Sequence, residues 1–103
     1  MVKRKIIWSP RAKLDLFEIL DFYYKRNGTK TYSNKLNSKI RASVRLLEKH
    51  YDIGVKSDIH NVRNLIEGDY GIFYEINDGI IEIITIWDNR RNPENLLKKQ
   101  PDN

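Results

Sequence analysis

The fold is decided by residues 62–87, which read VRNLIEGDYGIFYEINDGIIEIITIW. Three segments rich in β-branched and aromatic residues make up this stretch: 62–67, 70–77 and 80–87. Gly68-Asp69 separates the first two segments, and Asp78-Gly79 separates the last two. Two-residue connections of this kind specify tight hairpins between antiparallel strands. The stretch therefore predicts a three-stranded antiparallel meander.

The two turns also determine which side chains share a face of this meander. With two-residue loops, Glu67 pairs with Tyr70 and Asn77 pairs with Ile80. The first face, which we assign to the core, then carries Leu65, Tyr70, Ile72, Tyr74, Ile76, Ile81, Ile83, Thr85 and Trp87. The second face carries Val62, Asn64, Ile66, Gly71, Phe73, Glu75, Glu82, Ile84 and Ile86.

The first half of the chain predicts a short strand and two helices. Residues 3–8 are typical of a strand, and Ser9-Pro10 then supplies an N-cap acceptor and a proline at the first helical position. The first helix has an apolar stripe formed by Ala12, Leu16, Ile19, Leu20 and Tyr23. It ends at Asn27-Gly28, and a second helix begins near Thr29. The second stripe is formed by Tyr32, Leu36, Ile40, Val44 and Leu47. The short break between the helices predicts an antiparallel hairpin.

Both helical stripes need an apolar surface to cover, and the first face of the meander supplies it. We therefore predict an α+β fold with the order β-α-α-β-β-β, in which the helix hairpin packs on one face of a small, mainly antiparallel sheet. The second face stays open, and its apolar members include Ile66, Phe73, Ile84 and Ile86. Such a surface typically binds a partner, although residues 92–100 folding back over it is an alternative. Glu75 lies opposite Glu82 on this face, so the pair either sits in solvent or meets a cation.

Composition indicates one small domain. The chain has 103 residues, 40% of them hydrophobic, with no cysteine and a net charge of +5 from 19 Lys and Arg against 14 Asp and Glu. We expect a single domain over residues 1–103, a frayed tail at 98–103 and a cytoplasmic location. The apolar stretch Ile6-Ile7-Trp8 is too short for a signal peptide, and no run approaches the roughly 18 residues of a membrane span. We expect no membrane partner.

Motifs for cofactor chemistry are missing from the sequence. It contains no Gly-rich phosphate loop, no His-x-x-x-His pair and no carboxylates clustered for a metal. We therefore expect no cofactor, no metal and no small-molecule substrate.

The second predicted helix carries an excess of positive charge. The residues concerned are Lys35, Lys39, Arg41, Arg45 and Lys49. Stacked like charges weaken a helix by a few tenths of a kcal/mol per pair, and they persist more readily when a polyanion or an acidic partner neutralises them. These residues form either a target-binding face or the solvated face of a basic protein.

Three motifs in this order carry a resemblance to a known family. They are Trp8-Ser9-Pro10-Arg11-Ala12, Tyr70-Gly71-Ile72-Phe73-Tyr74 and the Arg-rich turn from Asp88 to Pro93. Together with the order of the elements, they make nearly the whole chain resemble the RelE/ParE superfamily of bacterial toxins from type II toxin–antitoxin modules. The resemblance implies a growth-inhibiting toxin that a cognate antitoxin holds inactive, by strand addition or by laying a helix on apolar surface. The open face with Ile66, Phe73, Ile84 and Ile86 suits such an antitoxin.

The superfamily includes two mechanisms. RelE-like members cleave messenger RNA on the ribosome without a metal, using Lys and Arg side chains and a tyrosine, whereas ParE-like members poison DNA gyrase. At the positions that the resemblance assigns to cleavage, this chain has Gly71 for the arginine of the central strand, Val62 and Asn64 for paired lysines, and Leu96 for the terminal tyrosine. Only Arg90, with Arg91 beside it, keeps a matching charge. The resemblance therefore favours ParE-like target binding, with gyrase as the expected target and no bond cleavage.

Two alternatives stay open from the sequence. One is a ribosome-dependent mRNA endoribonuclease that uses Arg90 and Arg91 for phosphate and His60 as a base. If these residues have no catalytic role, His60 is a solvated loop residue and the arginines pair with neighbouring carboxylates. The other alternative is a small, non-toxic RNA-binding α/β module.

Overall fold

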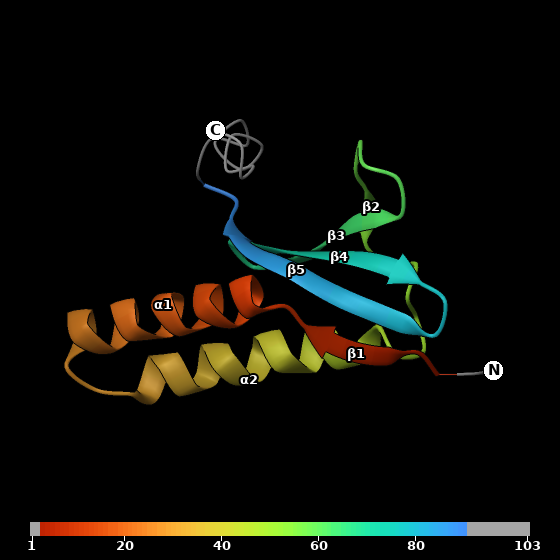
Figure 1. Ribbon diagram of the computed structural model, residues 1–103. Helices are drawn as coiled ribbons and strands as arrows, with labels where there is room; N and C mark the ends of the chain where they lie inside the picture. The colour runs from red at the N-terminus through yellow and green to blue at the C-terminus, as the bar shows by residue number, and fades with distance from the viewer. Residues whose placement is uncertain (1–2, 91–103) are drawn as a thin grey trace.

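In a computed structural model, which describes residues 3–90 of the chain, two helices pack against one face of a five-stranded sheet (Figure 1). The elements are β1 (Lys5–Trp8), α1 (Pro10–Asn27), α2 (Thr31–Leu46), β2 (Val55–Lys56), β3 (Val62–Glu67), β4 (Tyr70–Asn77) and β5 (Ile80–Asp88). The order across the sheet is β1-β5-β4-β3-β2, in which β1 runs parallel to β5 and the other neighbours are antiparallel. The predicted α+β fold, with a helix hairpin on one face of a mainly antiparallel sheet, is confirmed.

The two ends of α1 follow the sequence signals. The Ser9 hydroxyl accepts a hydrogen bond from the Ala12 N–H at 3.0 Å and donates to the Ile84 carbonyl at 2.8 Å, so the cap also joins the helix to β5. Gly28 adopts a φ of 76° and donates its N–H to the Tyr24 carbonyl at 2.9 Å. This left-handed conformation carries no steric cost at glycine and ends the helix there.

Helix α2 is shorter than its apolar stripe indicates. It begins at Thr31, after an N-cap residue, Lys30, that makes no side-chain capping hydrogen bond, and it ends at Leu46. Lys49 therefore lies in the turn that follows the helix and does not continue the row of Arg41 and Arg45 along it.

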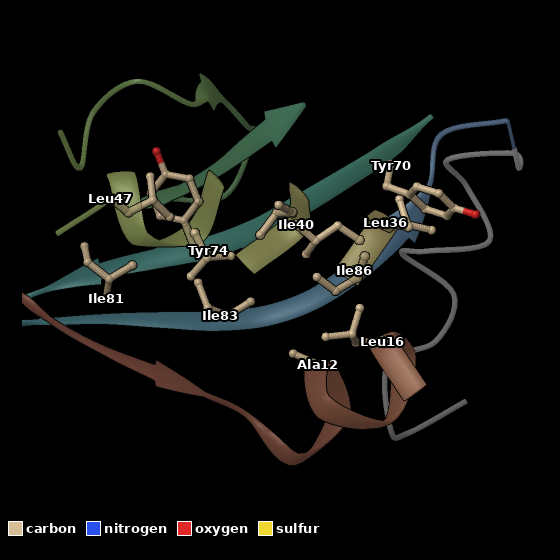
Figure 2. Close-up of a cluster of buried hydrophobic side chains, with 12 residues drawn as sticks. Ala12, Leu16, Leu36, Ile40, Leu47, Tyr70, Tyr74, Ile81, Ile83 and Ile86 are labelled. Atoms are coloured by element: carbon tan, nitrogen blue, oxygen red, sulfur yellow. The ribbon is translucent and has the colours of Figure 1, made fainter. Parts of the chain in front are cut away.

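The core lies between the helix pair and the sheet (Figure 2). Its fully or nearly fully buried members are Ala12 and Leu16 of α1; Leu36, Ile40 and Val44 of α2; Leu47 after it; and Tyr70, Ile72, Tyr74, Ile81, Ile83 and Ile86 of β4 and β5. The hairpin registers match the prediction, since Glu67 pairs with Tyr70 and Asn77 pairs with Ile80. The two-residue turns thus set which residues of β4 face the helices.

A bulge in β5 changes the facing of the last residues of the sheet. Phe73 pairs with Thr85, but Tyr74 pairs with Ile83, so Ile84 is an extra residue in β5. Ile86 therefore points to the helices and is only 4% exposed, while Trp87 pairs with Gly71 on the other face. The prediction that Ile86 lies on the second face and Trp87 on the core face was wrong. A hairpin turn sets the register of a strand only up to the first bulge, and the bulge at Ile84 reverses the faces of the residues after it.

Strand β2 was not predicted, because two residues are too few to show a pattern. The loop before β2 is hydrogen-bonded to Tyr74, whose hydroxyl accepts from the Gly54 N–H at 2.9 Å and donates to the Tyr51 carbonyl at 2.8 Å. A Cβ at Gly54 would lie 2.6 Å from this hydroxyl oxygen, so the close approach requires glycine. The loop before β2 is thereby fastened to the centre of the core.

Candidate functional site

The face of the sheet opposite the helices is the first candidate surface, and we call it the open face (Figure 1). Cross-strand pairing places Ile66 beside Gly71 and Phe73 beside Asn64 on this face. Ile66 is 51% exposed, and Phe73 and Ile84 are half-buried. Of the four residues proposed from the sequence to bind an antitoxin, Ile86 is removed from this surface by the bulge.

Gly71 is buried on the open face beneath two amide side chains. A Cβ built on it would collide with the Asn64 amide and lie 2.9 Å from the Asn89 amide oxygen. A larger side chain at this position would have to displace Asn64, which belongs to the neighbouring strand β3. The packing thus explains why this position has no room for an arginine.

Arg90 is held by carboxylates at the end of β5. Its Nε and Nη2 donate to the two carboxylate oxygens of Asp88 at 2.9 and 2.8 Å, and its Nη1 lies 3.7 Å from a carboxylate oxygen of Asp69. The hydrogen bond with Asp88 is the main reason why the pKa of Arg90 is raised above its usual value. To bind a phosphate, this guanidinium would first have to give up a bidentate partner.

A hollow of about 340 Å³ lies beside Arg90, between α1 and the end of β5. The Tyr70 hydroxyl donates to the Tyr23 hydroxyl at 3.1 Å. Burial is the main cause that raises the pKa of Tyr70, and this hydrogen bond raises it further. The acidic residues that line the hollow are Asp15, Glu18 and Asp88. Because three carboxylates accompany one cation, Arg90, among the described residues of its lining, the hollow is a poor site for RNA phosphate. This hollow was not predicted from the sequence, because the spacing of both tyrosines is typical of core residues.

The structure does not bring the proposed nuclease residues together. His60 is exposed in the turn before β3, at the end of the sheet where Val62 pairs with Glu75. Arg90 follows the opposite end, where Tyr70 pairs with Asp88. The six residues of β3 alone span about 20 Å, so one substrate phosphate cannot contact both side chains. Arg91, the third proposed residue, lies outside the described residues.

The basic surface of α2 is the second candidate site. The five residues proposed from the sequence to bind a target are all exposed: Lys35, Lys39, Arg41, Arg45 and Lys49. Within residues 3–90 none of them forms an ion pair, so their charge is not neutralised by the fold. The Arg41 guanidinium lies 5.3 Å from the centre of the Trp8 ring, and its Nε donates to the Asn37 amide oxygen at 2.9 Å.

An apolar groove adjoins this basic surface. It has a volume of about 390 Å³ and is lined by Trp8, Leu16, Phe17 and Leu20, with Lys13, Asn37 and Arg41 at its polar side. Phe17 is 64% exposed, which is unusual for a phenylalanine. The groove was not predicted from the sequence; the one signal for it was Phe17, a phenylalanine that lies off the buried stripe of α1. Apolar and cationic side chains therefore meet on one side of the helix pair.

The described residues form neither a metal site nor a membrane-spanning helix. Among residues 3–90, no three His, Asp or Glu side chains are grouped so that they could hold a metal ion. Neither α1 nor α2 is long and apolar enough to cross a membrane.

Comparison with known proteins gives one family and several similar structures. Residues 6–93 match the family described as the ParE toxin of type II toxin-antitoxin system, parDE. A chromosomal ParDE toxin–antitoxin system from P. aeruginosa contains a chain that is 24% identical, with a TM-score of 0.72; the similarity covers 82% of this chain and 94% of that one.

Two further similar structures are toxin–antitoxin complexes. A chain of the RelBE2 complex from Mycobacterium tuberculosis is 15% identical with a TM-score of 0.60, covering 85% of this chain and 93% of that one. A chain of the E. coli DinJ-YafQ complex is 12% identical with a TM-score of 0.56, covering 86% and 96%. At these identities the structures establish the fold. No curated protein gives a significant match.

Proposed function

Because the chain belongs to the ParE toxin family of type II toxin–antitoxin systems, we propose that it arrests growth by binding a macromolecular target without cleaving RNA, and that a cognate antitoxin silences it by covering the open face. The single observation that carries the choice of mechanism is the packing at Gly71. An oxyanion-stabilising donor is worth roughly two to three orders of magnitude in rate. Here the amides of Asn64 and Asn89 fill the space that such a donor would need.

The surroundings of Arg90 support the same choice. Its guanidinium is engaged by Asp88 and approached by Asp69, and the hollow beside it is mainly acidic. A catalytic arginine has to meet the negative charge that develops on the phosphate in the transition state. A guanidinium already neutralised by two carboxylates contributes little to that task.

We assign target binding to the basic surface of α2 and the adjoining groove. Positive side chains without ion-pair partners suit a polyanion, and an apolar groove beside them suits an inserted side chain. A target that offers protein and DNA together, such as DNA gyrase on its substrate, matches both features. The residues we assign to target binding are Lys35, Lys39, Arg41, Arg45 and Lys49.

We assign antitoxin binding to the open face around Ile66, Phe73 and Ile84. Two of the similar structures are described as toxin–antitoxin complexes, and the first is described as a toxin–antitoxin system. The open face offers apolar side chains that the chain's own helices do not cover. Covering this surface would remove apolar area from water and stabilise a complex.

The test begins with growth. Expression of the chain alone should stop growth, and co-expression of the reading frame that adjoins its gene should restore it. Purified chain should then inhibit the supercoiling of a relaxed plasmid by gyrase. Prompt cleavage of messenger RNA in cells, with gyrase unaffected, would replace the proposed mechanism by that of an endoribonuclease; absence of growth arrest would favour a non-toxic RNA-binding module.

Charge variants locate the target surface. Replacing Arg41 and Arg45 by glutamine should raise the concentration needed for half-inhibition of gyrase about tenfold or more, since each lost phosphate contact weakens binding. A matched control replaces Lys25 and Arg26 by glutamine, which removes the same charge at the far end of α1. Equal inhibition by both double variants would show that α2 does not contact the target.

A further inference from the structure

Two carboxylates face each other on the open face, close to the turn between β4 and β5. Glu75 of β4 pairs directly with Glu82 of β5, and opposed side chains of this kind have Cβ atoms about 5 Å apart. Both side chains are half-buried. Within residues 3–90 neither carboxylate has a hydrogen bond or an ion pair. Neither carboxylate of the pair is therefore in direct contact with a cation within the described residues.

The direct cross-strand neighbours of this pair are apolar, while Lys5 of β1 lies one row away on the same face, opposite Ile80, and forms no ion pair within the described residues. In the same cross-strand row, Val62 lies beside Glu75 and Ile7 lies beside Glu82. Val62 is 7% exposed and Ile7 is 40% exposed. Ile7 is thus the neighbour still open to a partner; a partner that covered it would also remove water from the carboxylates, and ionised groups that lose water need a counter-charge.

From this charge complementarity we propose that the antitoxin segment covering the open face carries an arginine or lysine whose head group lies between Glu75 and Glu82. Its aliphatic stem and the apolar residues beside it would rest on Phe73 and Ile7. A guanidinium suits the site best, because its fork of donors can engage two carboxylates at once. This inference rests on the proposed function, since it gives the chemistry of the surface already assigned to the antitoxin.

A basic residue in the partner is the opposite of what the net charge of the chain alone would favour. A protein of net charge +5 attracts an acidic partner overall. The open face instead requires one basic side chain at a defined position within that partner. Specificity among antitoxins would follow, because a segment without this cation would bury two unpaired carboxylates.

The experiment uses the full chain and, as the probe, the protein encoded by the adjoining reading frame. Dissociation constants are measured for the wild type, for Glu75→Gln and Glu82→Gln, and for the double variant. Glu18→Gln is the control, because it removes one carboxylate from the exposed side of α1. Thermal unfolding of each free variant is recorded in parallel.

We expect the double variant to bind at least about tenfold more weakly, while its melting temperature is equal to or above that of the wild type because like-charge repulsion is relieved. Glu18→Gln should bind within about twofold of the wild type. Unchanged affinity of the double variant would overturn the inference and leave the proposed function standing. A lower melting temperature of the free double variant would also overturn it, by showing that the chain itself supplies the cation. Failure of the wild type to bind the probe would instead reject the proposed function.

Discussion

Asp15 fastens α1 to the bulge in β5, and its removal gives the sharpest test of the fold. Its carboxylate accepts from the Thr85 hydroxyl, from the Ile86 N–H at 3.2 Å and from Arg11 Nε at 3.1 Å. The side chain of Asp15 is only 13% exposed. The Asp15 side chain thus joins α1 to the residues that follow the bulge in β5.

The size of the effect follows from these contacts. Hydrogen bonds to a charged group contribute about 1.5–3 kcal/mol each, and a buried N–H left without an acceptor costs about 1–3 kcal/mol. The pair with the half-exposed Arg11 adds little. Because such contributions are not additive, we expect Asp15→Ala to lower the free energy of unfolding by about 2–4 kcal/mol, a large part of the 5–15 kcal/mol typical of a domain.

Urea unfolding followed by circular dichroism measures this loss. Asp21→Ala is the matched control, since Asp21 lies on the same helix and makes one ion pair, with Lys25 at 3.0 Å; we expect a change below about 0.5 kcal/mol. A double-mutant cycle of Asp15→Ala with Thr85→Val should show a coupling of about 1 kcal/mol or more. A loss for Asp15→Ala no larger than that of the control, or no coupling to Thr85, would refute the reasoning.

Further predictions concern three positions, Gly71, Tyr74 and Gly28. Gly71→Ala should lower the free energy of unfolding by about 1–3 kcal/mol because its Cβ meets the Asn64 amide, and calorimetry should show a smaller loss when Asn64→Ser is added; equal losses would contradict the contact. Tyr74→Phe should cost about 1–3 kcal/mol in urea unfolding because the buried Gly54 N–H loses its acceptor. Burial raises the pKa of Tyr74 above its usual 10, so the stabilisation linked to its proton is complete below pH 10 and is lost as pH rises above it. The free energy of unfolding of the phenylalanine variant should therefore fall less between pH 9 and pH 11 than that of the wild type. Parallel plots of the two free energies against pH would contradict this. Gly28→Ala should cost about 1 kcal/mol because of the left-handed φ, and a melting temperature equal to that of the wild type would argue against that conformation.

The elements of the fold were predictable where the signal is local. A serine and a proline begin α1, a glycine with positive φ ends it, and two-residue turns set the pairing of β3, β4 and β5. Each of these features depends on a few neighbouring residues, so it is visible in the sequence. The bulge at Ile84 was not visible, because it is fixed by Asp15 and Ser9, which lie about seventy residues away in the chain.

The candidate site was predictable only in part, for the same reason. The exposed cations of α2 could be predicted from their helical spacing. The glycine at position 71, where the resemblance implies an arginine in nucleases, is visible directly in the sequence. The engagement of Arg90 by Asp69 depends on the turn between β3 and β4 meeting the end of β5. The groove beside Phe17 depends on how α1, α2 and β1 meet, and no local pattern specifies that.

A translation extract programmed with an end-labelled message tests the central claim most directly, which is that this toxin obstructs a target and breaks no RNA bond. The purified chain is added over the same range of concentrations as in the gyrase assay, and the length of the message is followed over time. If the chain acts without cleaving RNA, the message stays at full length. Prompt shortening of the message by the wild type, abolished in Arg90→Ala, would contradict it.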